Sequence, residues 1–475
     1  MQSRIDATMK TSIGARASRP GRVGTRARPL LAAALAAGLA GCGDSSSEPP
    51  ATDDPSPAPV AAPPDGPTPP GPVATTPAFA GSDVTVERFG TRTARDADPD
   101  ADEATLAATV AAINDFSFDL HRAAVAAGAG GVESGYGALV ALSLALAGTE
   151  GDTRAALAAL LGLDAIEEDG VHRALNAIAL ALESRANEDL VLRVADRAFV
   201  APDLPLTDAF LDVATGQYGA PVVAADFRNA APEVVERINA WVSDATDGLI
   251  PTLLAELDPA TRFVLLNAIF LDAAWRDPYF PVEAFDFTGD GGTTVPVAGF
   301  AGESFLPFGR TDGLTALEIP YGGDEIAMLV MMPPTGGLEA LEASLDAAAL
   351  DAIVGTLAPG EVAFTMPVWE DDASVDLVAA LAPSGFPPNP WDFGRMIGPG
   401  EDPSLAVAAL QKARIEVDEN GTRAAAATAV VATTDSEPAE PERIVVDRPF
   451  VYALRDRTTG TVLFTGRVTS PGTDG

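Results

Sequence analysis

Hydrophobic positions recur with two different periods along this chain of 475 residues. Apolar side chains at a spacing of three to four residues predict amphipathic helices over 104–127, 137–163 and 171–184. Later runs rich in β-branched and aromatic residues predict strands at 190–200, 261–271, 314–321, 325–333, 361–369, 413–419 and 461–468. Helices gather early and strands late, without the regular strand–helix alternation of a parallel sheet. The pattern therefore predicts an α+β fold with largely antiparallel sheets.

The N-terminal region has the composition of a targeting segment. Residues 1–29 carry several Arg side chains, and an apolar run at 30–40 follows them. That run is too short for a membrane span, which takes about 20 apolar residues, and it is typical of an export signal. The segment LAGC ends at Cys42, the only cysteine, and it resembles a bacterial lipobox. The resemblance implies a signal peptide at 1–41, export, and a lipid on Cys42 that anchors the protein to the bacterial cell envelope.

Composition divides the remainder of the chain into two parts. Residues 42–103 are dense in Pro and acidic side chains, which predicts a disordered tether. Residues 104–471 contain no comparable break and are predicted to form one domain. The chain has 68 acidic against 30 basic residues, so we expect no nucleic-acid partner, because few cations are available to neutralise phosphates.

Residues that carry out chemistry are scarce. The two histidines, His121 and His172, lie on predicted helices fifty residues apart, and we interpret them as surface or packing residues. The single cysteine is assigned to the lipid, which excludes Cys–His catalysis and thiolate metal sites. We find no G-x-S-x-G, H-E-x-x-H, P-loop or S-x-x-K motif in the sequence. The sequence therefore predicts a protein that is not an enzyme, without a catalytic residue, cofactor or metal of its own.

One segment near the C-terminus is unusual for its small side chains. Within EVDENGTRAAAATAVVATTDSEPAE (416–440), every residue of 421–434 except Arg423 is Gly, Ala, Thr or Val. Taken alone, the segment allows an Ala-rich helix, or a hairpin at Asn420-Gly421, which is a strong turn signal.

Further motifs give the segment a context. They are GTEGDTRAAL (148–157), LRVADRAFV (192–200), INAWVSDATDGLIPTLL (238–254), FVLLNAIFLDAAW (263–275), ALEIPYGGDEIAMLVMMP (316–333), VDENGTRAAAATAVV (417–431) and VDRPFVYALRDRTTGTVLFTGRV (446–468). In this order they resemble the signature segments of the serpin family, over about 104–471. The resemblance implies helices packed on three mostly antiparallel sheets, with an exposed reactive-centre loop that a protease cleaves. The cleaved loop then inserts into the central sheet as a new strand.

Insertion sets demands on the loop that the sequence meets. The hinge needs small residues, and alternate side chains must suit burial because they point to opposite faces of a strand. Every second residue from Thr422 to Ala432 is uncharged, and Arg423 falls on the face that points outward. The hinge that the resemblance implies comprises Glu419, Gly421, Thr422, Ala424, Ala425, Ala426, Ala427 and Thr428.

The resemblance also implies a reactive bond. Family spacing counted from Glu419 places it at Asp435-Ser436, which implies a target that cuts after acidic residues. A bond among Val430, Val431 and Ala432 instead implies an elastase-like or subtilisin-like target.

Other family positions lie where the central strands must part. Asn267 matches the polar position of the shutter, and Trp275 matches the aromatic residue of the breach, where insertion begins. Gln411 stands where the family has a histidine, and it can still bond to Asn267. Gly137 stands where a serine is expected, and it cannot.

The leading hypothesis is therefore a suicide-substrate inhibitor of serine or cysteine proteases. The expected partner is a target serine protease in a covalent acyl complex. We expect membrane contact through the N-terminal lipid only, and a monomer. A serpin without inhibitory activity, acting as a binding or scaffold lipoprotein at the cell surface, is the alternative. A substrate-binding or structural lipoprotein of another class would require the serpin segments to be coincidental.

Overall fold

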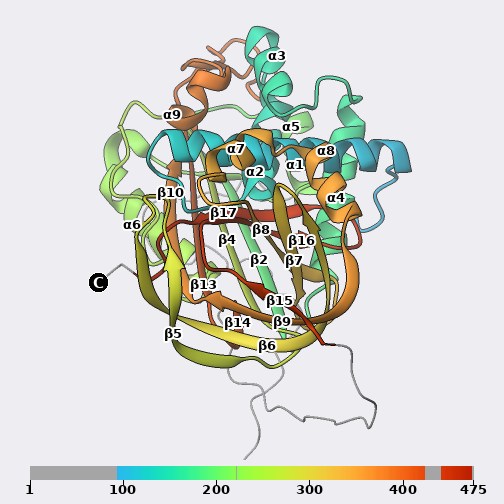
Figure 1. Cartoon of the computed structure of the whole chain (residues 1–475). Helices are drawn as coiled ribbons and strands as arrows, with labels where there is room; N and C mark the ends of the chain where they lie inside the picture. The colour runs from blue at the N-terminus through green and yellow to red at the C-terminus, as the bar shows by residue number, and fades with distance from the viewer. Residues whose placement is uncertain (1–93, 221, 423–439, 473–475) are drawn as a thin grey trace, which may run out of the picture. The chain divides into compact units, whose positions relative to one another are not determined.

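The computed structural model describes residues 94–220, 222–422 and 440–472. Its helices are α1 (Glu103–Ala126), α2 (Gly135–Gly148), α3 (Gly151–Leu160), α4 (Glu168–Glu183), α5 (Asp208–Gly216), α6 (Phe227–Ala245), α7 (Leu338–Ser344), α8 (Ala347–Gly355) and α9 (Leu377–Leu381). Many of them gather at one end of the sheets, as Figure 1 shows. Within the described ranges, no helix is both long and apolar enough to cross a bilayer.

The central sheet has the strand order β10-β13-β14-β4-β2-β3. These strands are β2 (Leu190–Val200), β3 (Val222–Ala224), β4 (Phe263–Ala274), β10 (Trp369–Asp376), β13 (Val407–Val417) and β14 (Gly421–Thr422). The strands β4 and β13 pair directly and in parallel, with 263–269 opposite 407–413. Beyond that point the two-residue strand β14 lies between them and pairs with both. The sheet is therefore closed along most of its length and holds an added strand at one end.

The second sheet has the order β1-β17-β16-β8-β7-β6-β9-β15, with β5 also paired to β6. Its strands are β1 (Val132–Glu133), β5 (Phe280–Thr288), β6 (Thr294–Thr311), β7 (Leu314–Pro320), β8 (Ile326–Met332), β9 (Ala358–Pro367), β15 (Glu442–Val445), β16 (Phe450–Asp456) and β17 (Val462–Val468). The 18-residue strand β6 pairs with β5 and β9 over most of its length and with β7 at its end, so it joins two parts of the sheet. A short pair, β11 (Trp391–Asp392) and β12 (Ser404–Leu405), forms a third sheet.

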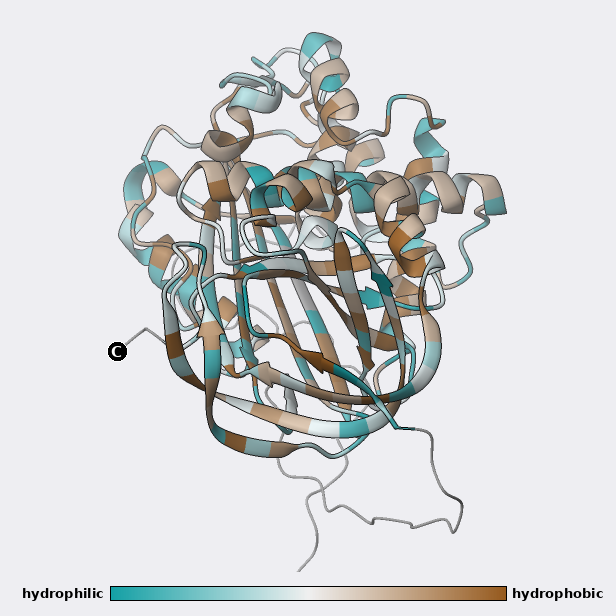
Figure 2. Ribbon diagram, in the orientation of Figure 1, coloured by the Kyte–Doolittle hydropathy of each residue, from teal (hydrophilic) through white to brown (hydrophobic). Residues whose placement is uncertain are grey.

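The predicted α+β class with mostly antiparallel sheets is confirmed in the described residues. Figure 2 shows hydrophobic residues along both the central strands and the helices that cover them. Buried and half-buried residues alternate most regularly along β13, where every second residue from Val407 to Val417 is buried. Among the strands of the described ranges, parallel pairing is limited to β4–β13, β2–β3 and β9–β15.

Two predicted boundaries differ from the structure. The helix expected over 137–163 is two helices, because Thr149 has extended backbone after α2 and Gly151 begins α3 with a φ of 59°. Defined contacts also begin before residue 104. Asp96 N donates to the carbonyl of Gly216 at 2.8 Å, and Asp102 caps α1 by accepting from the backbone of Thr105 at 3.0 Å.

Candidate functional site at the loop hinge

The hinge begins inside the central sheet. After β13 ends at Val417, the chain turns and returns as β14 between β13 and β4. Thr422 pairs with Val417 on one side and with Ala273 on the other, and Gly421 pairs with Ala274. Both hinge residues are buried. The first two residues of the predicted insertion segment therefore already occupy the position of a central strand.

A tight turn carries the chain into this position. Asp418 N donates to the carbonyl of Gly421 at 3.0 Å, and the carboxylate of Asp418 accepts from the backbone N–H groups of Asn420 and Gly421 at 2.7 and 3.2 Å. Gly421 has a φ of 152°, and a Cβ atom there would lie 2.1 Å from the carbonyl oxygen of Ala273. Only glycine fits this position. Glu419 lies within the turn and is half-buried.

Thr422 is fixed by a side chain from the second sheet. It is only 1% exposed, and its hydroxyl lies 2.6 Å from the hydroxyl of Tyr321. Burial raises the pKa of Tyr321, so its hydroxyl keeps its proton and can donate. Both hydroxyl groups are satisfied by this bond. The pair stabilises the inserted position of the hinge.

Trp275 holds the turn from the other side. Its indole Nε1 donates to the carbonyl of Asp418 at 2.8 Å, and its backbone N–H donates to the carbonyl of Asn420 at 3.0 Å. Its ring stacks on Tyr321 with 4.5 Å between centroids. The structure thus places Trp275, which the sequence assigned to the start of insertion, against the hinge turn. Tyr321, which sequence reasoning missed as a site residue, lies in the quoted segment 316–333.

The predicted shutter residues meet where β4 and β13 pair directly. Gln411 Nε2 donates to Asn267 Oδ1 at 2.7 Å and to the carbonyl of Ser134 at 2.7 Å. Ser134 N donates back to Gln411 Oε1 at 3.0 Å. The bond that the sequence allowed between Gln411 and Asn267 is therefore present. Gly137 leaves room for Asn267, because a Cβ there would lie 2.4 Å from its Nδ2 atom.

Comparison with known proteins identifies the family. The family model described as Serpin (serine protease inhibitor) matches residues 111–471. The chain belongs to the serpin family. A serpin-like protein of Thermococcus kodakarensis is 30% identical over 76% of this chain and 85% of its own length. Leukocyte elastase inhibitor of Sus scrofa is 30% identical over 70% of this chain and 90% of its own. The native structure of the thermophilic serpin tengpin, 23% identical, aligns with a TM-score of 0.72 over 82% of this chain and 100% of its own.

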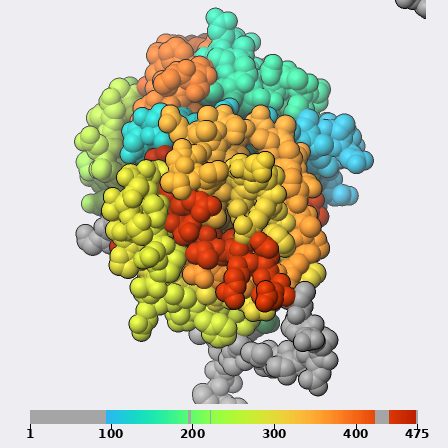
Figure 3. All heavy atoms as spheres, in the orientation of Figure 1, coloured from blue at the N-terminus to red at the C-terminus, as the bar shows by residue number. Residues whose placement is uncertain are grey.

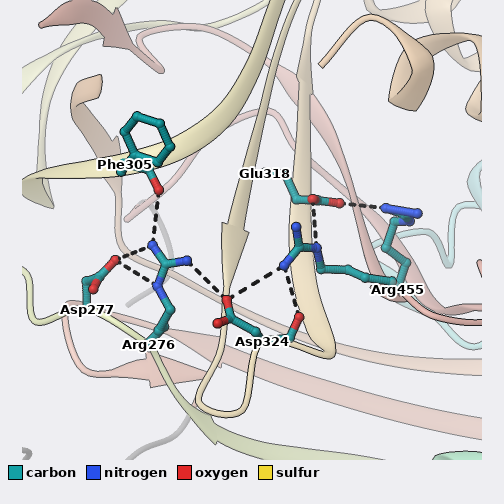
Figure 4. A network of polar contacts seen from close by, with 7 residues as sticks. Arg276, Asp277, Phe305, Glu318, Asp324 and Arg455 are labelled. Carbon is teal, nitrogen blue, oxygen red and sulfur yellow. Dashed lines mark hydrogen bonds and ion pairs between the residues drawn. The ribbon is translucent and has the colours of Figure 1, made fainter. Parts of the chain in front are cut away.

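An ion-pair network connects the hinge region of this serpin to the second sheet. Figure 4 shows Arg276, which follows Trp275, bonding to Asp277 and, at 3.0 Å, to Asp324. A second group of bonds links Glu318 to Arg455 at 2.6 Å. Because these residues come from the end of β4, the β7–β8 hairpin and β16, the network ties the insertion end of the central sheet to the strands behind it.

A further arginine joins the two groups. Arg457 lies 3.1 Å from Glu318 and 3.7 Å from Asp324. Glu318 is buried, and two arginines surround its carboxylate, as a buried charge requires. The network is continuous from Arg276 to Arg455.

The two histidines of the serpin domain are both buried packing residues. His121 Nδ1 lies 2.8 Å from Glu133 and its Nε2 lies 3.3 Å from Glu342. Burial opposes its charge, but the hydrogen bonds and charges of these carboxylates outweigh burial and raise the pKa of His121 to about 9. His172 bonds to the hydroxyl of Tyr218 at 2.6 Å, and burial lowers its pKa to about 4. At neutral pH, His121 is therefore protonated and positively charged, whereas His172 is neutral.

The remaining predicted site residues lie outside the described residues. They are Ala424, Ala425, Ala426, Ala427 and Thr428 of the hinge, Asp435 and Ser436 of the reactive bond, and Cys42 of the lipid site.

Proposed function

We propose that this serpin is a suicide-substrate inhibitor of serine proteases, and that the same mechanism extends to cysteine proteases. One observation carries the proposal. Gly421 and Thr422 lie between β4 and β13 at one end of the central sheet, while the same two strands pair directly below them. The hinge is thus aligned to extend into the sheet when the loop is cut.

The target protease carries out the first chemical step. Its serine attacks the carbonyl carbon of the reactive bond, and the new amine leaves with a proton from the protease histidine, which gives an acyl ester on the serpin loop. The small, uncharged residues on alternate positions after Thr422 suit entry between β4 and β13. We place the reactive bond at Asp435-Ser436, which selects a protease that cuts after acidic residues.

Insertion exchanges one set of contacts for a larger one. The strands β4 and β13 must part, which breaks the bond between Gln411 and Asn267. About a dozen new ladder hydrogen bonds at ~0.5–1.5 kcal/mol each, with apolar burial, would release roughly 10–20 kcal/mol. That is comparable to the stability of a whole domain, so it is enough to displace and distort a covalently attached protease.

The test uses the full serpin domain and a panel of proteases. We would incubate residues 94–475 with trypsin, chymotrypsin, pancreatic elastase, subtilisin and a glutamate-specific serine protease, and run a denaturing gel. We expect a band of higher mass that survives SDS, together with a released C-terminal peptide whose mass identifies the reactive bond. The matched control is each protease with its active-site serine blocked, which should give neither product. Cleavage without a stable complex from every protease would contradict inhibition and favour a serpin that only binds.

We also propose that the protein is exported and anchored to the bacterial cell envelope through a lipid on Cys42. The motif LAGC and the Pro-rich segment after it support the proposal. Detergent partitioning and mass spectrometry of the N-terminal peptide test it. A Cys42→Ser variant should lose the lipid and leave the membrane fraction, and equal membrane retention of both forms would contradict the anchor.

A further inference from the structure

Large apolar side chains are exposed at three positions in the described part of the chain. Phe280 is 59% exposed, Phe305 is 56% exposed and Val445 is 46% exposed. They lie on β5, β6 and β15, which all belong to the same end of the second sheet. Figure 3 shows the atoms of β15 uncovered at the surface. Exposed aromatic residues that gather in one place mark binding surfaces more often than scattered ones.

Strand register places the three side chains on one face. Phe280 is paired with Ala301, Ala301 with Thr365, and Thr365 with Val445, so these four residues form one row across the sheet. Residues paired across strands share a face. Phe305 lies four positions after Ala301 on β6, and side chains four positions apart on a strand point to the same side. We call this surface the β5–β15 face.

Charged residues lie between and beside the apolar ones. The next row of the same face pairs Glu303 with Ala363 and Ala363 with Arg443. Beyond it, Phe305 is paired with Glu361. Both glutamates and Arg443 are exposed. Protein–protein interfaces are enriched in aromatic residues and arginine, and polar side chains form their rims.

Hydrogen bonds fix the backbone beneath this face. Arg276 donates to the carbonyl of Phe305 at 3.1 Å, and Figure 4 shows the ring of Phe305 pointing away from the ion-pair network. At the other edge, Arg310 lies 2.9 Å from Glu442 and donates to the carbonyl of Arg443 at 2.5 Å. The strands that carry the exposed side chains are therefore held in place before any partner binds, which lowers the entropy cost of binding.

The chain connects this face directly to the predicted reactive bond. Val445 follows Ser436 by nine residues. At ~3.3 Å per extended residue, the two are at most about 30 Å apart. A protease domain of ordinary size has a radius of gyration of roughly 17 Å, so its body is large enough to span that distance. A protease that holds the reactive bond is therefore within reach of the β5–β15 face.

We infer that the β5–β15 face is a second docking surface for the target protease, used in addition to the loop. This inference rests on the proposed inhibitory function. The partner surface should be apolar where it meets Phe280 and Phe305, and basic where it meets Glu303 and Glu361. The face selects among proteases that cleave the same bond, because contacts outside the loop add to the rate of the first encounter.

The test measures the association rate constant of complex formation for each panel protease that forms a stable complex. The variants are Phe280→Ser/Phe305→Ser and Glu303→Lys. The matched control is Glu339→Lys, a charge reversal of the same kind at an exposed position of α7, outside the face. We expect the double variant to react about tenfold more slowly with the preferred protease, and Glu303→Lys to react several-fold more slowly at low salt. The control should match the wild type.

The number of serpin molecules consumed per inhibited protease separates docking from insertion. This number should stay unchanged in the variants of the β5–β15 face, because their hinge and central sheet are untouched. Thermal unfolding should show that these variants remain folded. Rate constants within twofold of the wild type for every protease would overturn the docking surface alone. If the wild type forms no stable complex with any protease, the proposed function fails, and this inference fails with it.

Discussion

Replacing Thr422 by Arg puts a charged side chain where the loop enters the central sheet. In the wild type, Thr422 is 1% exposed and bonds to the hydroxyl of Tyr321. Because Thr422 is buried between β4 and β13, the sheet leaves little room there for the longer, charged side chain of an arginine. We expect the arginine to leave the sheet and to take β14 with it.

The structure gives the size of this change. Withdrawal of β14 removes the pairings of Thr422 with Ala273 and Val417, that of Gly421 with Ala274, and the bond to Tyr321. At ~0.5–1.5 kcal/mol for each of these four interactions, the loss is roughly 2–6 kcal/mol. Keeping an unpaired arginine in the slot would cost several kcal/mol more, since burying an ion without a partner is expensive. The fold persists because β4 and β13 still pair along 263–269.

The effect on inhibition should be far larger than the effect on stability. Insertion starts at Thr422, so every inserted state of the variant must bury the arginine. Insertion then becomes slow compared with hydrolysis of the acyl ester, and the protease is released active. The variant becomes a substrate instead of an inhibitor.

The balance between insertion and hydrolysis is measured by titrating a protease that the wild type inhibits with increasing amounts of serpin. A denaturing gel then separates the complex from cleaved serpin. Thr422→Arg should give cleaved serpin and almost no complex, with thermal unfolding that remains cooperative. Thr422→Ser keeps the hydroxyl and is the matched control, which should inhibit nearly as well as the wild type. If Thr422→Arg forms stable complexes with the wild-type stoichiometry, the reasoning that insertion begins at this buried position is wrong.

Three further predictions concern the packing around the hinge and the shutter, and the buried histidines elsewhere in the domain. Gly137→Ser restores the residue expected from the family, but the added Cβ would lie 2.4 Å from Asn267 Nδ2. We expect it to lower the free energy of unfolding by about 1–3 kcal/mol, as measured by denaturant unfolding. Trp275→Phe removes the indole bond to the hinge turn and should lower the melting temperature while increasing proteolysis of the loop, measured with a nonspecific protease. The pKa of His172 is about 4 when folded and 6.5 when unfolded, so stability is complete above pH 6.5 and falls by roughly 3 kcal/mol toward pH 4. His121, with a folded pKa of about 9, acts oppositely: its contribution is complete below pH 6.5 and is lost toward pH 9. Melting temperatures of His172→Gln, His121→Gln and the wild type, measured from pH 4 to 9, test both pH dependences. If each variant changes with pH in parallel with the wild type, both predictions are wrong.

Local patterns were enough to predict many of the elements. The strand β13 buries every second residue, and that alternation is visible in its sequence. The turn at Asn420-Gly421 was also predictable, because a glycine after an asparagine is a strong signal for a tight reversal. The helix boundary at Thr149 was not, because the apolar spacing continues across it, while the break itself lies in the extended backbone of Thr149 and the positive φ of Gly151.

The sequence by itself determined that this chain has an α+β fold, a run of small residues able to enter a sheet, and the segments that mark it as a serpin. Only the tertiary structure decided that Thr422 already lies in the sheet, and that Tyr321, about a hundred residues earlier, bonds to it. The same holds for Gln411, whose amide joins Asn267 and Ser134. Periodicity along a strand tells which side chains are buried. It does not tell which distant residues they meet, because the free energy of those contacts depends on how all the elements pack together.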